Sequence, residues 1–177
     1  MQSPLKTDSL RDFLAQPNIE GSPAWEFIEG IATQKPMPTL FHSRLQRNLV
    51  NAINQQTTEY EAIQELRCLV PPFSPVPDIS VVKQERLDQD GALEGAPEWL
   101  IEIRSPNQST LDLQNKILHC LGRETKLAWL IDIERERVWV WENEELPIIY
   151  AGDSLLPTLG DVQGLTVDRA IAMTQQR

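Results

Sequence analysis

The stretch PEWLIEIRSPN, residues 97–107, places a charged residue in the middle of an apolar run. The run extends from Trp99 to Ile103 and is bounded by prolines, which predicts a short buried strand. Glu102 interrupts it. An ionised carboxylate is costly to bury unless it is paired, hydrogen-bonded or bound to a metal ion. The fold must therefore supply Glu102 with a partner.

A second carboxylate stands in a comparable position. Asp78 opens the apolar stretch PDISVVK, residues 77–83, directly after a proline. If the two strands are neighbours, Asp78 and Glu102 can converge on one cation. Two carboxylates, completed by water and substrate phosphate, form the kind of oxygen site that Mg²⁺ prefers. Their spacing alone leaves another interpretation open, in which Asp78 only begins a strand and Glu102 faces solvent from an edge strand.

A basic residue follows on the next predicted element. Apolar residues recur at helical spacing over residues 111–123, and Lys116 lies on the flank of that stripe. Its flexible side chain could reach the end of the sheet beside the two acids. The simpler alternative is a solvent-exposed ion pair with Asp112, four residues earlier on the same side of the helix.

The rest of the chain predicts a mixture of helices and strands rather than a repeated strand–helix–strand unit. We therefore expect an α/β (α+β) fold, with a central mixed β-sheet flanked by helices. One domain is expected over residues 1–177, with its core from about 25 to 173. The other predicted elements are helices at 7–15, 41–55 and from 168, a hairpin at 25–34, strands at 62–70, 77–83, 127–133, 135–142 and 148–151, and a loop at 84–98.

Two of these elements carry further expectations. The helix at 41–55 is predicted to place His42 on its outer face, away from the apolar stripe. The stretch RERVWVWE, residues 135–142, alternates valines with Trp139 and Trp141. One of these tryptophans is expected to be exposed on an edge strand, where it would suit the contact surface of a homodimer.

Composition and charge limit the classes of function. Hydrophobic residues make up 41% of the chain and charged residues 24%, as in ordinary globular proteins. With a net charge of −10, the chain lacks the excess of basic residues that is typical of nucleic-acid-binding proteins. Either the partner is not nucleic acid, or a metal ion and a local basic patch offset the repulsion. Without a long apolar run or a secretory pattern at its N-terminus, the chain is expected to be cytoplasmic and free of membranes.

The cysteines could form a metal site of a different kind. Cys68 and Cys120, together with His42 and His119, offer zinc ligands. Neighbouring residues on a helix point about 100° apart, which does not suit His119 and Cys120 as ligands of one ion. Buried free thiols are the preferred interpretation.

The order of the motifs resembles one protein family. A proline–aspartate pair at 77–78, followed by a strand with Glu102 and Arg104, resembles the PD-(D/E)XK nuclease superfamily. A closer resemblance, over nearly the whole chain, is to the family of "putative restriction endonucleases" abundant in cyanobacteria. The segments that carry it, in order, are SLRDFLAQP, WEFIEGIA, FHSRLQRNLVNAI, VPDISVV, PEWLIEIRSPNQST, DLQNK, LAWLIDIERERVWVW and LPTLGDVQGLTVD.

This resemblance implies a restriction-endonuclease-like fold and an endonuclease that hydrolyses phosphodiester bonds with Mg²⁺, or with Mn²⁺ in its place. Nucleic acid, with DNA expected, would be the substrate. Asp78 and Glu102 would be catalytic and bind the metal, with the backbone carbonyl of Ile103 as a third ligand. Lys116 would replace the superfamily's lysine, whose position holds Arg104 here. Arginine cannot serve as a base, but it can hold a phosphate oxygen.

Auxiliary roles are implied for four other residues. Members of the superfamily often place an acidic or polar group on the first helix, where this chain offers His42 and Gln46. Glu26 and Glu29, in the preceding strand, are acidic substitutes. The alternative function is a catalytically silent module of the same fold that binds nucleic acid or a protein partner. Arg104 and the net charge favour that alternative.

Overall fold

A six-stranded mixed sheet forms the centre of the computed structural model, which describes residues 5–6 and 9–177. The strand order is β11-β10-β9-β8-β6-β4. Strands β8 and β9 run parallel, and all other neighbours in this sheet are antiparallel. The predicted mixed sheet is thus confirmed. Its strands are β4 (Tyr60–Gln64), β6 (Ile79–Lys83), β8 (Trp99–Ile103), β9 (Leu127–Asp132), β10 (Arg137–Trp141) and β11 (Ile148–Ala151).

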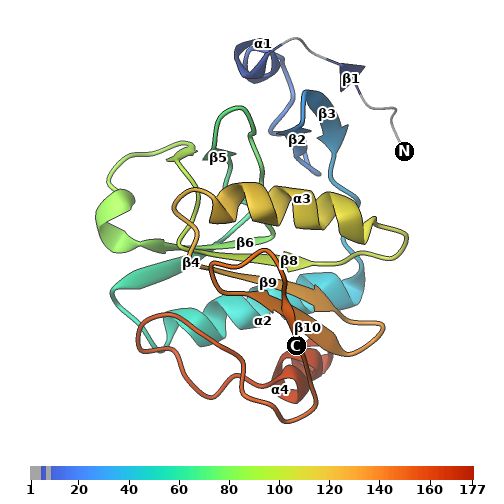
Figure 1. The fold of residues 1–177 in the computed structure, drawn as a ribbon, viewed down its shortest axis with the longest axis vertical. Helices are drawn as coiled ribbons and strands as arrows, with labels where there is room; N and C mark the ends of the chain where they lie inside the picture. Colours follow the sequence, from blue (N-terminus) through green and yellow to red (C-terminus); the bar gives the residue numbers. More distant parts are fainter. Residues whose placement is uncertain (1–4, 7–8) are drawn as a thin grey trace.

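Helices cover both faces of this sheet (Figure 1). Successive side chains of a strand point to opposite faces, so Ile101 packs in the cluster with α2 (Leu40–Asn54) and α4 (Val167–Ala172), while Leu100 packs against α3 (Thr110–Leu121). Burial on both faces explains why β8 and β9 read as continuous apolar stretches. Among the described residues, none of the helices could span a lipid bilayer.

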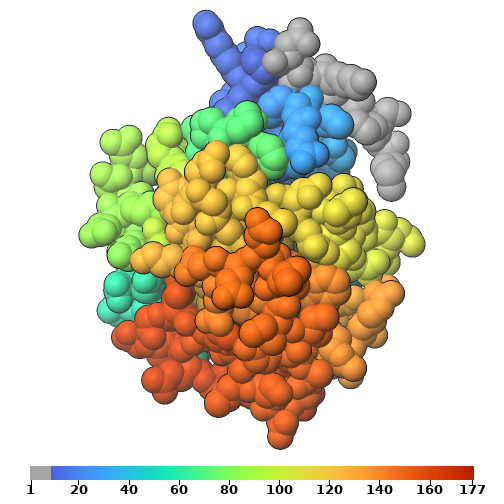
Figure 2. All heavy atoms as spheres, viewed as in Figure 1, coloured from blue at the N-terminus to red at the C-terminus, as the bar shows by residue number. Residues whose placement is uncertain are grey.

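A smaller N-terminal layer lies at one end of the molecule, beside α3. It contains α1 (Leu10–Leu14) and a three-stranded sheet in the order β1-β3-β2. The predicted hairpin at 25–34 is confirmed. In Figure 2, α3 (yellow to gold) lies between this layer (blue) and the β10–β11 segment (orange). The strands of the layer are β1 (Leu5–Lys6), β2 (Trp25–Ile28) and β3 (Ile31–Gln34).

Arg67 connects this layer to the rest of the fold through hydrogen bonds. Its guanidinium donates hydrogen bonds to the main-chain carbonyls of Ile19 and Trp25, and to the hydroxyl of Ser74. The same group lies 5.3 Å from the centre of the Phe13 ring, within the range of a cation–π contact. Arg67 thereby fixes the loop after residue 19, which forms part of the pocket described below.

Some predicted boundaries are wrong for local reasons. The strand expected at 62–70 is two strands, because Glu65 has a positive φ of 52° that ends β4. The second piece, β5 (Cys68–Leu69), pairs with β7 (Leu93–Glu94) inside the predicted loop, which also contains the 3-10 helix η1 (Gln84–Arg86). The helix expected at 7–15 starts on residues outside the described ones; α1 begins after Ser9, and η2 (Met173–Gln175) follows α4.

The expectation of an exposed tryptophan on an edge strand is also wrong. Strand β11 pairs with the outer edge of β10, so β10 is an internal strand of the sheet. Trp141 is fully buried in the cluster against α3, and Trp139 is only partly exposed beside it. The large apolar side chains exposed on the edge strand are instead Ile148 and Ile149.

Candidate functional site

Asp78 directly precedes β6, and Glu102 lies in β8, the strand beside it. Strands β6 and β8 pair antiparallel with Ile79 opposite Ile101, and the same register continued by one residue sets Asp78 opposite Glu102. Opposite residues of an antiparallel pair have side chains close together on one face. Both acids are buried. The predicted neighbourhood of the two strands is confirmed.

Three donors hold the Asp78 carboxylate. Oδ2 accepts a hydrogen bond of 2.7 Å from the Ile103 N–H and lies 3.3 Å from His42 Nε2, while Oδ1 accepts one of 2.9 Å from Lys35 Nζ. Gln46 Nε2 donates to the Asp78 carbonyl at 2.6 Å. Burial alone would raise the pKa of Asp78, but Lys35, His42 and the Ile103 N–H outweigh it and hold that pKa well below its usual range.

Lys35 is a site residue that the sequence interpretation missed. Its ammonium donates to Asp78 Oδ1, to the Val76 carbonyl at 2.7 Å and to Glu65 Oε2 at 2.6 Å. Burial would lower the pKa of Lys35, yet nearby carboxylates, Asp78 first, raise it above its ordinary value. The stretch KPMPT, which begins at Lys35, has no strand or helix period. The only feature of the sequence that could have indicated a role for Lys35 is its position just before Pro36 and Pro38, which restrict the backbone.

A second ion cluster surrounds Glu102. Lys116 reaches from α3 into the sheet, where its Nζ lies 2.6 Å from Glu102 Oε1 and 2.8 Å from Glu26 Oε2. The same Glu26 oxygen accepts a hydrogen bond of 2.7 Å from the Val76 N–H. Lys116 is 3% exposed. The structure therefore shows the inward-reaching lysine, and the alternative of an exposed pair with Asp112 is wrong.

The two facing acids have pKa values displaced in opposite directions. Burial raises the pKa of Glu102 to about 8; Lys116 opposes this shift, and the negative charge of Asp78 adds to it. Burial would lower the pKa of Lys116, but Glu102 and Glu26 raise it above its ordinary value. Two neighbouring acids whose pKa values are shifted in opposite directions are typical of functional sites.

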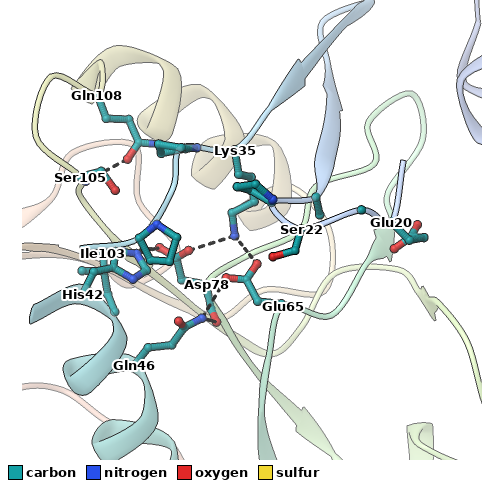
Figure 3. Close-up of a pocket in the computed structure, with 15 residues that line it drawn as sticks. Glu20, Ser22, Lys35, His42, Gln46, Glu65, Asp78, Ile103, Ser105 and Gln108 are labelled. Atoms are coloured by element: carbon teal, nitrogen blue, oxygen red, sulfur yellow. Dashed lines mark hydrogen bonds and ion pairs between the residues drawn. The ribbon is translucent and has the colours of Figure 1, made fainter. Parts of the chain in front are cut away.

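Asp78 opens onto a pocket of about 280 Å³ (Figure 3). His42 and Gln46 reach toward it from α2, and Lys35 and Glu65 lie on the other side of Asp78. The prediction that His42 lies on the outer face of its helix is wrong, since it is 5% exposed. Its Nδ1 is buried without a hydrogen-bond partner among the described residues. The other lining residues are Glu20, Gly21, Ser22, Pro23, Ala24, Pro36, Pro38, Ile103, Ser105 and Gln108.

The carboxylate oxygens of this site suit a divalent cation that also binds water and substrate. Four carboxylates (Glu26, Glu65, Asp78 and Glu102) and two ammonium groups leave a formal charge of −2 when Glu102 is ionised and −1 when it is protonated, with His42 counted as neutral. Within residues 5–6 and 9–177, no three His, Cys, Asp or Glu side chains form a ready-made metal cluster. Mg²⁺ commonly takes only one or two carboxylates and keeps several waters. Two facing carboxylates with an uncompensated charge match that habit.

The remaining predicted residues lie apart from these two clusters. Arg104 directs its guanidinium toward Glu134, with Nη1 3.8 Å from Oε2. Glu29 is exposed in the turn between β2 and β3, with a positive φ of 52°. Cys68 and Cys120 are buried free thiols in the cluster against α3. His119 stacks on Phe73.

The sequence matches the Uma2 family, described as "Putative restriction endonuclease", over residues 10–170. The structure is similar to a crystal structure described as "a putative nuclease belonging to DUF820" from Anabaena variabilis. The two chains share 34% sequence identity with a TM-score of 0.87, and the match covers 95% of this chain and 99% of that one. No curated protein matches the sequence. The chain belongs to the Uma2 family, and this membership supports a nuclease function.

Proposed function

Starting from that membership, we propose that the chain is a divalent-metal-dependent endonuclease that hydrolyses phosphodiester bonds, with DNA as its substrate. One observation carries the proposal. Asp78 directly precedes β6, beside the strand β8 that carries Glu102, the Ile103 N–H donates to the Asp78 carboxylate, and Lys116 contacts Glu102 from α3. These are the residue types of a PD-(D/E)XK site, with the lysine supplied by a helix instead of by position 104.

Asp78, Glu102 and the Ile103 carbonyl would hold the ion, Mg²⁺ or Mn²⁺. When bound, such an ion polarises a phosphate oxygen and lowers the pKa of a coordinated water. Asp78 is prepared for this role because its hydrogen bond from the Ile103 N–H and its contact with Lys35 keep the carboxylate ionised and oriented. Glu102 would be ionised more readily once a cation adds to the field of Lys116.

Lys116 supplies a fixed positive charge. Its ammonium is held by Glu102 and Glu26 inside a water-poor site, where a preorganised charge acts more strongly than in water. We assign it the stabilisation of negative charge that develops on the phosphate, or the orientation of the attacking water. Arg104 would hold a phosphate oxygen, because its contact with the exposed Glu134 is long and easily exchanged.

The charges at the mouth of the pocket make nucleic-acid binding dependent on the metal. Glu20 and Glu65 are exposed there; Glu20 pairs with Arg67, and Glu65 shares Lys35 with Asp78, so these three carboxylates have only two cations. A phosphate approaching this surface meets net negative charge. A divalent ion at Asp78 and Glu102 would reverse the sign locally, so affinity for DNA should rise steeply with Mg²⁺.

The experiment is a plasmid-nicking assay with a Mg²⁺ titration. We expect nicking that requires Mg²⁺, stops with EDTA and is lost in Glu102→Gln. The matched control is Glu85→Gln, because Glu85 is exposed in η1 and should nick as wild type. Nicking in EDTA, or a wild-type rate for Glu102→Gln, would contradict the proposal.

A second candidate is a catalytically silent module that binds nucleic acid or a protein. Its specific support is Arg104, which stands at the superfamily's lysine position and contacts Glu134. Metal-dependent DNA binding without any nicking, measured with the same plasmid, would favour this candidate over the enzyme.

A further inference from the structure

We propose that the ammonium group of Lys35 occupies the second cation position of this site, so that the chain binds one divalent ion and not two. The inference rests on the proposed function for the first ion, at Asp78 and Glu102. It concerns the other side of Asp78, where Lys35 and Glu65 meet it.

The contacts of Lys35 are those of a cation that bridges two carboxylates. Its Nζ lies 2.9 Å from Asp78 Oδ1 and 2.6 Å from Glu65 Oε2, and a third hydrogen bond goes to the Val76 carbonyl at 2.7 Å. An ammonium has three N–H donors, and each has an acceptor here. Three oxygen atoms thus converge on one positive charge, as they would on a metal ion.

Asp78 has the arrangement of a shared ligand. Oδ1 contacts Lys35, while Oδ2 accepts from the Ile103 N–H on the strand that carries Glu102. Nuclease sites with two metals hold the ions about 3.5–4 Å apart. A carboxylate that offered one oxygen to each position would join such a pair. In this chain Asp78 Oδ1 is turned to Lys35, and Oδ2 lies against β8 with His42 Nε2 3.3 Å away.

The surrounding chain keeps Lys35 in place. Pro36 follows it directly and restricts its backbone, and the Lys35 side chain is 8% exposed. Glu65 is 44% exposed, yet its other oxygen is held by Gln46 Nε2 at 3.0 Å. The acid that would complete a second metal site is therefore oriented, and the lysine fills the position before a metal can.

Lys116 does not have this role, although it also bridges two acids. Its cluster with Glu26 and Glu102 is closed, with side-chain exposures of 3%, 13% and 2%. Lys35, Asp78 and Glu65 all line the pocket. Removal of Lys35 therefore leaves two carboxylates at a place that water and ions can reach.

The test is the stoichiometry of Mn²⁺ binding, from titration calorimetry and from the electron paramagnetic resonance signal of free Mn²⁺. We expect one ion per wild-type chain, two for Lys35→Ala, and one again for Lys35→Ala combined with Glu65→Gln. Lys126→Ala, which removes an exposed lysine, is the control and should bind one ion.

Two ions bound to the wild-type chain would overturn the inference, and so would one ion bound to Lys35→Ala when the wild type also binds one. No ion on the wild type but one on Lys35→Ala would support the role of Lys35 while refuting the proposed first site. No ion on either chain would refute both. If circular dichroism shows that Lys35→Ala is unfolded, Lys35→Gln replaces it, because its amide removes the charge and can still donate hydrogen bonds.

Discussion

Two buried lysines, each bridging a pair of acids, divide the site into a closed half and an open half. Lys116 joins Glu26 and Glu102 beneath α3, where all three side chains are largely shielded from solvent. Lys35 joins Asp78 and Glu65 at the pocket, where Glu65 is 44% exposed. The chemistry of the two halves is alike, and their access to solvent differs.

The difference in solvent access decides which half can exchange partners. In the closed half, packing fixes Lys116 and Glu26, so these two charges act on a substrate through their field and not by direct ligation, whereas Glu102 is also the proposed metal ligand. In the open half, an ion or a phosphate can compete for the carboxylate oxygens. Asp78 and Glu102 stand at the boundary between the two halves.

The largest effect is expected for Lys116→Ala. Loss of a preorganised charge that acts in the transition state typically lowers turnover by about 10²–10³. Asp78 and Glu102 remain, so Mg²⁺ affinity should change little. Single-turnover cleavage at saturating Mg²⁺ and DNA measures the first quantity, and calorimetry the second. Lys126→Ala serves as the matched control.

Arg104→Ala completes that comparison. It should weaken DNA binding and leave slow residual turnover, because Arg104 lies outside the closed cluster. A wild-type cleavage rate in Lys116→Ala, together with an inactive Arg104→Ala, would show that Arg104 supplies the charge and that the closed half is only structural.

Asp78→Asn should cause the next largest effect, on stability and metal binding together. Breaking a buried ion pair by removing one partner costs about 3–5 kcal/mol. Lys35 keeps Glu65, so we expect about 3 kcal/mol, the lower end of that range. Urea unfolding measures it, with the exposed Asp88→Asn as control. Equal stabilities and unchanged Mg²⁺ affinity would show that Asp78 does not organise the open half.

A smaller effect is expected in the pH dependence of stability without metal. The pKa of Glu102 is about 8 in the folded chain and about 4.5 in an ordinary environment. Between these values the folded chain holds the extra proton, so this group's contribution to stability falls as the pH rises through that window. Asp78 acts oppositely: its pKa is lowered, so its contribution is lost as the pH falls below its ordinary value of 3.8.

Melting temperatures in EDTA from pH 5 to 9 measure the Glu102 effect. The wild type should lose stability toward pH 9, and Glu102→Gln should lose less. The exposed Glu85→Gln should follow the wild type. Parallel curves for all three chains would mean that Glu102 titrates normally and that the closed half compensates it fully.

The sequence carried more information about the closed half than about the open one. Glu102 was visible because a charge inside the apolar run of β8 needs a partner, and Lys116 because α3 has a clear helical period. Lys35 lies in a proline-rich segment without a period, and its contacts with Glu65 and Asp78 span 30 and 43 residues. The inward position of His42 and the break at Glu65 likewise depend on tertiary packing, which no local pattern encodes.

The smallest effects come from two glutamates of the N-terminal hairpin, and they define the border of the closed half. Glu26 Oε2 accepts from both Lys116 and the Val76 N–H, so Glu26→Gln keeps an oxygen acceptor but loses the charge that orients the lysine. A loss of about 1.5 kcal/mol, the low end for a hydrogen bond to a charged group, corresponds to roughly tenfold slower turnover. Glu29 is exposed in the turn, where substitutions usually change stability by less than about 0.5 kcal/mol, so Glu29→Gln should cleave as wild type. Single-turnover rates of the two variants decide the matter: if Glu29→Gln is slow and Glu26→Gln is not, the closed half ends at Lys116 and Glu102, and the hairpin acts through its exposed turn.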